Sequence, residues 1–145
     1  MKKLLPQANT LETVIKTFIY VANREKCTLQ DVASFCEFEL RQASYYTNAC
    51  YFIGLLNNDL TLSPLGCEMI SAGSNLKLKI YDVIINNAII GRIFHNMLLY
   101  PEVQAKALSE KWVRENYPDY SDAVIKRRTQ SLMNWCYEII SYIKW

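Results

Sequence analysis

The stretch Asn57-Asn-Asp-Leu-Thr-Leu-Ser-Pro-Leu-Gly66 decides how the first half of the chain is expected to fold. Its Asn-Asn-Asp start is a strong turn signal, and the alternating residues 60–62 are typical of a short strand. Ser63 followed by Pro64 marks a helix start, because serine caps helices and proline is tolerated at the first helical position. The stretch therefore predicts a short β-hairpin that leads directly into a helix.

Three helices are expected before this stretch. Hydrophobic residues recur at three- and four-residue spacing over 11–22, which is typical of an amphipathic helix, and Asn9-Thr10 is its expected cap. Thr28 begins a second, shorter helix, with Asp31 completing a capping box. A third helix ends at Gly54, a residue suited to a left-handed helix stop. Its buried side is expected to consist of Ala43, Thr47, Cys50 and Ile53.

The order of three helices, a terminal glycine, a hairpin and a fourth helix predicts a winged helix-turn-helix. The segments that resemble this family are Thr28-Leu-Gln-Asp-Val-Ala33, Arg41-Gln-Ala-Ser-Tyr-Tyr-Thr-Asn-Ala-Cys-Tyr-Phe-Ile-Gly-Leu-Leu56 and Leu60-Thr-Leu-Ser-Pro-Leu-Gly66. The last segment is similar to the point where the family's wing leads into its next helix. The resemblance implies a mainly α fold with a short β-hairpin wing in residues 1–73.

Residues 74–145 are expected to form a helical extension packed on the first half. Helices are expected over 76–100 and 103–116, followed by a last helix that Ser121 caps. This order leaves open a second helix-turn-helix without a wing. The segment Tyr120-Ser-Asp-Ala-Val-Ile-Lys-Arg-Arg-Thr-Gln-Ser-Leu-Met-Asn-Trp-Cys-Tyr-Glu-Ile139 is similar to winged-helix segments of some restriction-modification and related DNA-handling proteins.

Composition narrows the class of protein. The chain has 145 residues, of which 51% are hydrophobic and 21% charged, so it can bury a core and is not a disordered or low-complexity chain. Its net charge of +2 divides into −1 for residues 1–72 and +3 for 73–145, which favours the second half as a polyanion contact. Five cysteines without a CxxC pair, no apolar signal segment and no membrane-length apolar run predict a cytoplasmic protein with free thiols.

The expected third helix carries the side chains for reading DNA. If its apolar face is buried, the residues that face outward are Arg41, Gln42, Ser44, Tyr45 and Asn48. In a helix-turn-helix this helix enters the major groove. Arginine pairs with guanine and the amides with adenine, while serine and tyrosine hydroxyls bind phosphates. The alternative is an ordinary polar helix face, with Glu37 and Glu39 just before it.

The last helix supplies the expected phosphate contacts. Lys126, Arg127 and Arg128 are the only run of three basic residues, and Thr129, Gln130 and Asn134 are expected to be exposed beside them. Cations near a helix start oppose the helix dipole, which suggests a binding purpose. The alternative is a solvated patch whose charges pair with Asp119, Asp122 and Glu138.

Catalytic and metal sites are not expected, and no cofactor is implied. His95, the single histidine, has apolar neighbours and is expected to be structural, so no zinc-ligand set can be assembled. The aromatic residues near the C-terminus are expected to pack in the core, with Trp145 at a homodimer seam. The sequence therefore predicts non-catalytic binding of double-stranded DNA, as a transcriptional regulator or a recognition component of a restriction-modification-like system. The rivals are a protein–protein interaction module and a subunit of a restriction-type nuclease.

Overall fold

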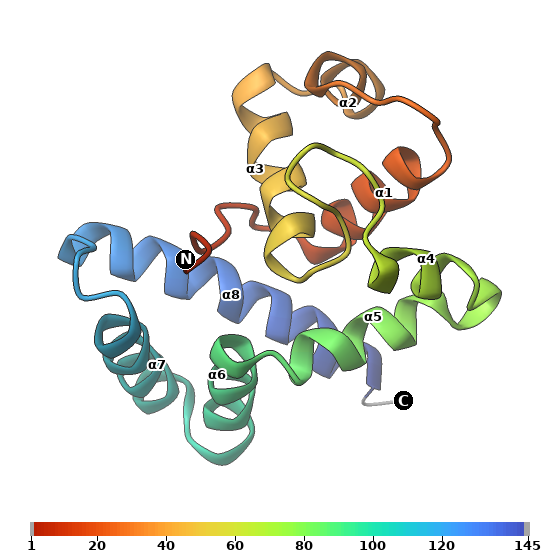
Figure 1. Ribbon diagram of the computed structural model, residues 1–145. Helices are drawn as coiled ribbons and strands as arrows, with labels where there is room; N and C mark the ends of the chain where they lie inside the picture. Colours follow the sequence, from red (N-terminus) through yellow and green to blue (C-terminus); the bar gives the residue numbers. More distant parts are fainter. Residues whose placement is uncertain (1, 144–145) are drawn as a thin grey trace.

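A computed structural model describes residues 2–143 of the chain, and within them it is mainly helical (Figure 1). The helices lie in two groups, with α1–α4 above α5–α8 in this view, and the long α8 passes between the N-terminal segment and α6 and α7. The elements are α1 (Leu11–Ala22), α2 (Leu29–Cys36), α3 (Leu40–Phe52), α4 (Pro64–Ile70), the 3-10 turn η1 (Gly73–Asn75), α5 (Leu76–Ile85), α6 (Ala88–Leu99), α7 (Glu102–Asn116) and α8 (Asp122–Ile143).

Local sequence signals set the ends of α2, α3 and α4 as expected. The Thr28 hydroxyl accepts a hydrogen bond from the Asp31 amide at 3.1 Å, and the Asp31 carboxylate accepts one from the Thr28 amide at 2.9 Å. Gly54 follows α3 with φ of 87°, a left-handed conformation that glycine adopts without strain. The Ser63 hydroxyl accepts from the Gly66 amide at 2.9 Å and caps α4. These three predictions are confirmed.

The segment between α3 and α4 closes as a loop and not as the expected two-stranded hairpin. Among the residues that the structure describes, its only antiparallel bridge joins Leu56 and Leu62. Inside the loop, the Asn57 amide donates to the Thr61 carbonyl at 2.8 Å. The Asp59 carboxylate accepts from the Thr61 amide and hydroxyl at 3.2 and 2.5 Å, which lowers its pKa. These tight local bonds shorten the arms of the loop, so the predicted strand is reduced to a single residue pair.

Gly66 holds this loop against α4 and gives a stability prediction. A Cβ at this position would lie 2.1 Å from the Leu55 carbonyl oxygen and 3.0 Å from the Leu62 side chain, so backbone must shift to admit it. We expect Gly66→Ala to lower the free energy of unfolding by about 1–3 kcal/mol in urea denaturation. Gly73→Ala, where a Cβ meets nothing within 4 Å, should cost less. Equal losses for both variants would contradict this account.

The helix expected over residues 76–100 is broken into α5 and α6, and the single-helix prediction is wrong. Asn87 lies between them with an extended backbone, and its side-chain oxygen accepts from the Ile89 and Ile90 amides at 2.9 and 3.1 Å. Asparagine competes well for this capping role, so the backbone leaves the helix and starts again. The break turns α6 away from α5 and lets α6 pack against α7 and α8 (Figure 1).

The first residues of the chain run along α8 in an extended conformation, and we call residues 2–10 the N-terminal strap. Its backbone is tied to the second half by three side chains. The Tyr117 hydroxyl donates to the Lys3 carbonyl at 2.9 Å, the Leu5 amide donates to the Tyr120 hydroxyl at 3.1 Å, and the Trp135 indole donates to the Ala8 carbonyl at 2.8 Å. These bonds give the strap a fixed path over α8.

The side chain that caps α1 comes from the far end of the sequence. Glu138 of α8 accepts from the Leu11 and Glu12 amides at 2.7 and 2.9 Å, whereas the Thr10 side chain makes no capping bond. A carboxylate suits this place because helix N-termini carry unpaired amides and positive partial charge. The expected cap by Asn9-Thr10 is therefore wrong in its side chain, and Glu138 does not pair with the basic run.

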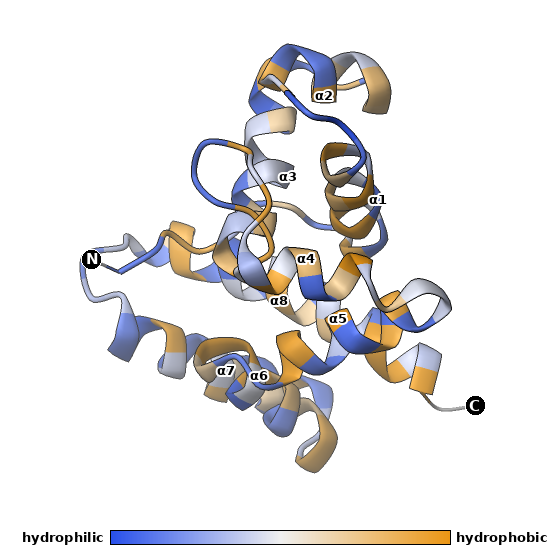
Figure 2. Ribbon diagram, turned by 45° about the vertical axis from the view of Figure 1, so that its right-hand side comes forward, coloured by the Kyte–Doolittle hydropathy of each residue, from blue (hydrophilic) through white to orange (hydrophobic). Residues whose placement is uncertain are grey.

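One cluster of buried hydrophobic residues runs through both halves of the chain, with Phe18, Ile80 and Trp135 fully buried. Figure 2 shows hydrophobic residues on the sides of the helices that face one another. Thr129 is also fully buried, which corrects the expected exposure. It lies four residues after Ile125 and three before Leu132, so it belongs to the inward stripe of α8. No helix within residues 2–143 is long and apolar enough to cross a bilayer.

Candidate nucleic-acid interface

A polar hollow of about 420 Å³ lies where α3, α8 and the N-terminal strap meet, and we call it the α3–α8 hollow. Its lining residues are Gln7, Asn9, Tyr45, Arg127, Arg128, Gln130 and Ser131. Tyr45 belongs to the set expected to contact DNA from the third helix, and three others belong to the set expected from the last helix. The fold therefore brings members of both sets to one place.

Hydrogen bonds from the strap fix the floor of the α3–α8 hollow. The Ser131 hydroxyl donates to the Asn9 side-chain oxygen at 2.6 Å, which joins the strap to α8. On the same helix, the Gln130 amide donates to the Asn134 side chain at 2.9 Å. Polar atoms thus line this wall, and an anion can replace their water contacts with hydrogen bonds. The sequence did not reveal the roles of Gln7, Asn9 and Ser131, because they depend on contacts more than 120 residues apart.

The two arginines of the hollow differ in exposure. Arg127 is exposed, while Arg128 is half-buried, and this burial lowers the pKa of its guanidinium from the ordinary value. Tyr120 and Tyr45 oppose that effect electrostatically. Arginine stays protonated at neutral pH, so the half-buried guanidinium remains a fixed cation. A partly desolvated arginine binds a phosphate more strongly than a fully hydrated one.

The remaining outward residues of α3 divide into two groups. Arg41 and Gln42 are exposed at the N-terminal end of α3, and they precede Tyr45 by four and three residues. This spacing places them on the same side of the helix as the α3–α8 hollow. Ser44 and Asn48 instead line a second polar hollow.

This second hollow lies between α3 and the loop before α4. Its other lining residues are Leu29, Thr47, Tyr51, Asn57, Asn58, Asp59 and Leu60. It contains no lysine or arginine among these residues, and the Asp59 carboxylate adds a negative charge. Phosphate binding is therefore assigned to the α8 side of α3, while Ser44 and Asn48 offer uncharged donors and acceptors on the other side.

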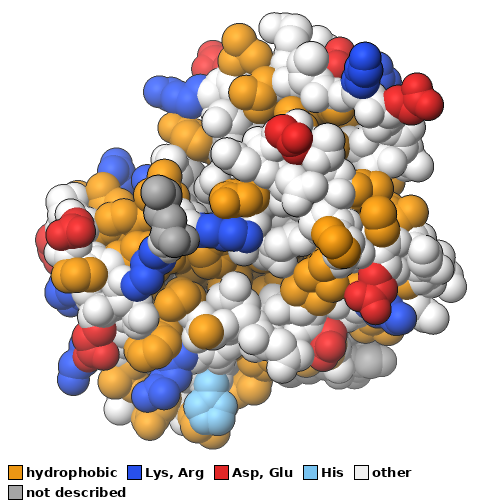
Figure 3. Space-filling view, viewed as in Figure 1, with side chains coloured by type: hydrophobic (Ala, Val, Ile, Leu, Met, Phe, Trp, Pro, Cys, Tyr) orange, Lys and Arg blue, Asp and Glu red, His pale blue; other side chains and the backbone are white. Residues whose placement is uncertain are grey.

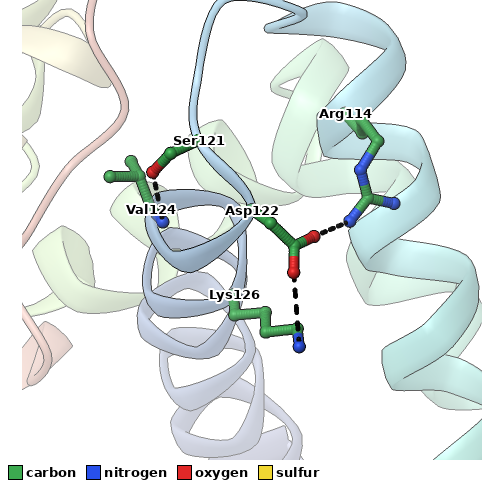
Figure 4. A network of polar contacts seen from close by, with 5 residues as sticks. All are labelled: Arg114, Ser121, Asp122, Val124 and Lys126. Carbon is green, nitrogen blue, oxygen red and sulfur yellow. Dashed lines mark hydrogen bonds and ion pairs between the residues drawn. The ribbon is translucent and has the colours of Figure 1, made fainter.

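Lys126 is directed toward α7 and does not line the α3–α8 hollow. Its ammonium group lies 3.4 Å from the Asp122 carboxylate, which also pairs with Arg114 at 2.6 Å (Figure 4). Ser121 caps α8 beside this network, where its hydroxyl accepts from the Val124 amide at 3.2 Å. Arg114 lowers the pKa of Asp122, assisted by Lys126. The three basic residues expected to act together thus lie on different sides of α8.

Two lysines of the strap add positive charge that the sequence reading did not assign to this face. The Lys3 ammonium donates to the Tyr51 carbonyl at 2.7 Å and lies 4.2 Å from the centre of the Tyr51 ring. The Lys2 ammonium lies 4.8 Å from the centre of the Tyr117 ring. Figure 3 shows several Lys and Arg side chains on the side where the N-terminus meets α7 and α8, with acidic side chains scattered over α7.

Groups that would support catalysis are not assembled in the part of the chain that the structure describes. No three His, Cys, Asp or Glu side chains among these residues are placed to hold a metal ion. His95 is exposed on α6, so the expectation that it packs in the core is wrong; the buried residues beside it are Ile93 and Phe94. All five cysteines are free. Burial raises the thiol pKa of Cys136 to about 12.

The expected aromatic cluster at the C-terminus is divided between core and surface. Trp135 is fully buried, as expected, whereas Tyr137 and Tyr142 are exposed. Tyr142 packs edge-on against Tyr81 with ring centres 5.4 Å apart. Trp145, the expected dimer seam, lies outside the described residues.

Comparison with known proteins places the chain in a family. The model of the family described as Domain of unknown function (DUF7226) matches residues 13–144, so the chain belongs to this family. No curated protein and no solved structure matches the chain. The matched range includes α3 and α8, the two helices that form the α3–α8 hollow.

Proposed function

We propose that this chain, a member of the DUF7226 family, binds double-stranded DNA without cleaving it. In this proposal α3 enters the major groove, and the α8 side of the hollow holds the adjacent phosphates. The single observation that carries it is the meeting of Tyr45 with Arg127 and Arg128 in one hollow. A helix that reads bases needs phosphate contacts beside it to fix its register on the duplex, and this arrangement supplies both.

The roles of the side chains follow from their chemistry and place. Arg41 and Gln42 lie at the exposed start of α3, where the residues of a recognition helix contact base edges. Arginine offers two donors to guanine, and glutamine matches adenine. The Tyr45 hydroxyl and the two guanidinium groups of the hollow bind phosphate oxygens. Gln130 and Ser44 add uncharged hydrogen bonds on either side, and Asn48 reaches the bases farther along α3.

The proposal includes a winged helix-turn-helix in the first half, with the loop of residues 57–62 in the place of the wing. The sequence resemblance supports this assignment, and so do the packing of α3 against α1 and α2 and the capped start of α4. The loop carries Asp59 and no cation, so it contributes little to phosphate binding. Within such a role, the chain serves as a transcriptional regulator or as the recognition part of a restriction-modification-like system.

Binding of a mixed-sequence duplex, measured by fluorescence anisotropy at several salt concentrations, tests this function. We expect saturable binding whose logarithmic affinity falls linearly with the logarithm of salt, with a slope of about −0.9 for each phosphate neutralised. Absence of binding to any duplex at low salt would contradict the proposal and favour the protein–protein module. Cleavage of the duplex with magnesium would favour the nuclease subunit.

Two acidic residues near α3 give a further prediction. Glu37 and Glu39 are exposed just before the helix and repel an approaching phosphate backbone. At about 10 Å in water, each charge contributes about 0.4 kcal/mol of repulsion. We therefore expect the pair of changes Glu37→Gln and Glu39→Gln to tighten duplex binding by about fourfold at low salt. Glu110→Gln and Glu115→Gln, on α7, provide the control and should leave affinity unchanged; an equal gain would indicate only a net-charge effect.

A further inference from the structure

An apolar hollow of about 600 Å³ lies along α1, on a different surface from the α3–α8 hollow. Ile15 and Ile19 form its floor, and the stacked rings of Tyr20 and Phe35 form one wall, with ring centres 4.0 Å apart. Phe35 is 45% exposed, which is unusual for a phenylalanine in a monomer with a well-formed core. The surface therefore has the composition of a protein contact.

Charged side chains occur in a definite order along this same face. Glu12 lies at the start of α1, Lys16 lies one turn later, and Arg24 lies just past the end of the helix. The Lys16 ammonium is 5.3 Å from the centre of the Phe35 ring, and the Arg24 guanidinium is 5.1 Å from the centre of the Tyr20 ring. None of these three charges takes part in the ion pairs found within residues 2–143. Their charge is thus available to a partner.

We propose that this face of α1 binds a second copy of the same chain, with the two α1 helices packed antiparallel across a twofold axis. An acid at one end and a base at the other make the face self-complementary, because the twofold axis sets each end against the opposite end. In this register Glu12 faces Arg24 of the second copy, and Lys16 faces the ring of its Tyr20. Ile15 and Ile19 of both copies fill the centre.

The order of charges also decides between occupants. A uniformly acidic partner would satisfy Lys16 and Arg24 but would meet Glu12 with like charge. A uniformly basic partner would meet two repulsive contacts. A second copy pairs both ends at once and buries the apolar centre, so self-association fits the charge pattern with no like-charge contact.

Charge reversal with a mixing step tests this interface. The measurement is sedimentation equilibrium over a wide range of protein concentration at low salt, with no nucleic acid present. We expect the unaltered chain to dimerise, and Arg24→Glu and Glu12→Arg each to weaken the dimer by more than about tenfold, because each variant opposes like charges. When the two variants are mixed, both ion pairs form again with reversed sign, so native mass spectrometry should detect the heterodimer.

Lys26→Glu is the matched control, because Lys26 is exposed two residues after Arg24 and does not line the hollow. Circular dichroism of each variant separates loss of pairing from loss of fold. A chain that stays monomeric at every concentration would overturn the proposal. The same conclusion would follow if Arg24→Glu dimerised as well as the unaltered chain, or if the mixed variants failed to pair. None of these results depends on DNA binding.

Discussion

Replacing Arg127 and Arg128 together by alanine should weaken duplex binding by about tenfold to a hundredfold, since two charge-assisted hydrogen bonds to phosphates are lost. The slope of logarithmic affinity against logarithmic salt should fall by about 1.8, or about 0.9 for each phosphate contact. Both effects follow from the position of the two guanidinium groups in the α3–α8 hollow. Fluorescence anisotropy with a mixed-sequence duplex provides the measurement.

Lys126→Ala is the matched control for this prediction, because it removes a neighbouring charge from the same helix. Lys126 pairs with Asp122 and lies on the α7 side of α8, so its loss should change affinity by no more than about twofold. If the lysine variant lost as much affinity as the double arginine variant, binding would depend on net charge alone. The assignment of the phosphate site to the α3–α8 hollow would then be wrong.

Trp135→Ala should cause the largest loss of stability among the changes considered, about 3–5 kcal/mol in the free energy of unfolding. The Trp135 side chain is fully buried, and its indole nitrogen donates to the Ala8 carbonyl at 2.8 Å. Truncation leaves a cavity in the shared core and also releases the strap from α8. Urea denaturation followed by circular dichroism measures the loss.

Trp135→Phe separates these two contributions, because it keeps an aromatic ring and removes only the hydrogen bond and part of the volume. We expect this variant to lose about 1–3 kcal/mol, since the Ala8 carbonyl is left without its donor. An unchanged unfolding midpoint for Trp135→Ala would show that the strap and the centre of α8 contribute little to stability. That result would also contradict the role of the strap in shaping the hollow.

The features that sequence reasoning predicted well depend on neighbouring residues. The capping box of Thr28 and Asp31, the stop at Gly54 and the cap of Ser63 each involve groups a few residues apart. The buried side of α3 was predicted for a similar reason, since it follows from helical spacing alone. From that buried side, the exposure of Arg41 and Gln42 followed directly.

The features that were missed depend on distant contacts or on competition between local signals. Glu138 caps α1 from 126 or more residues away, and Asn9 bonds to Ser131 across 122 residues. The break at Asn87 had a local signal, because asparagine is a strong cap, but the long apolar pattern on both sides outweighed it in the reading. Thr129 was judged by the charged run beside it, although its spacing from Ile125 indicated burial.

The candidate site shows the same division. The residue types for base and phosphate contact could be read from the sequence, but the choice among the basic residues could not. Lys126 is adjacent to Arg127, yet it lies on another side of α8 and pairs with Asp122. Lys2 and Lys3 come from the opposite end of the chain and reach this face through the strap. Only the packed arrangement shows which charges share one surface.

The central claim is that α3 and α8 contact one duplex together, and chemical-shift mapping by NMR tests it most directly. Titration of the ¹⁵N-labelled chain with a short duplex should shift backbone amides of 41–48 and of 127–131 at the same DNA concentration. Amides along the α1 face, from Glu12 to Arg24, should stay unchanged. Shifts confined to one of the two helices, or largest on the α1 face, would contradict the account.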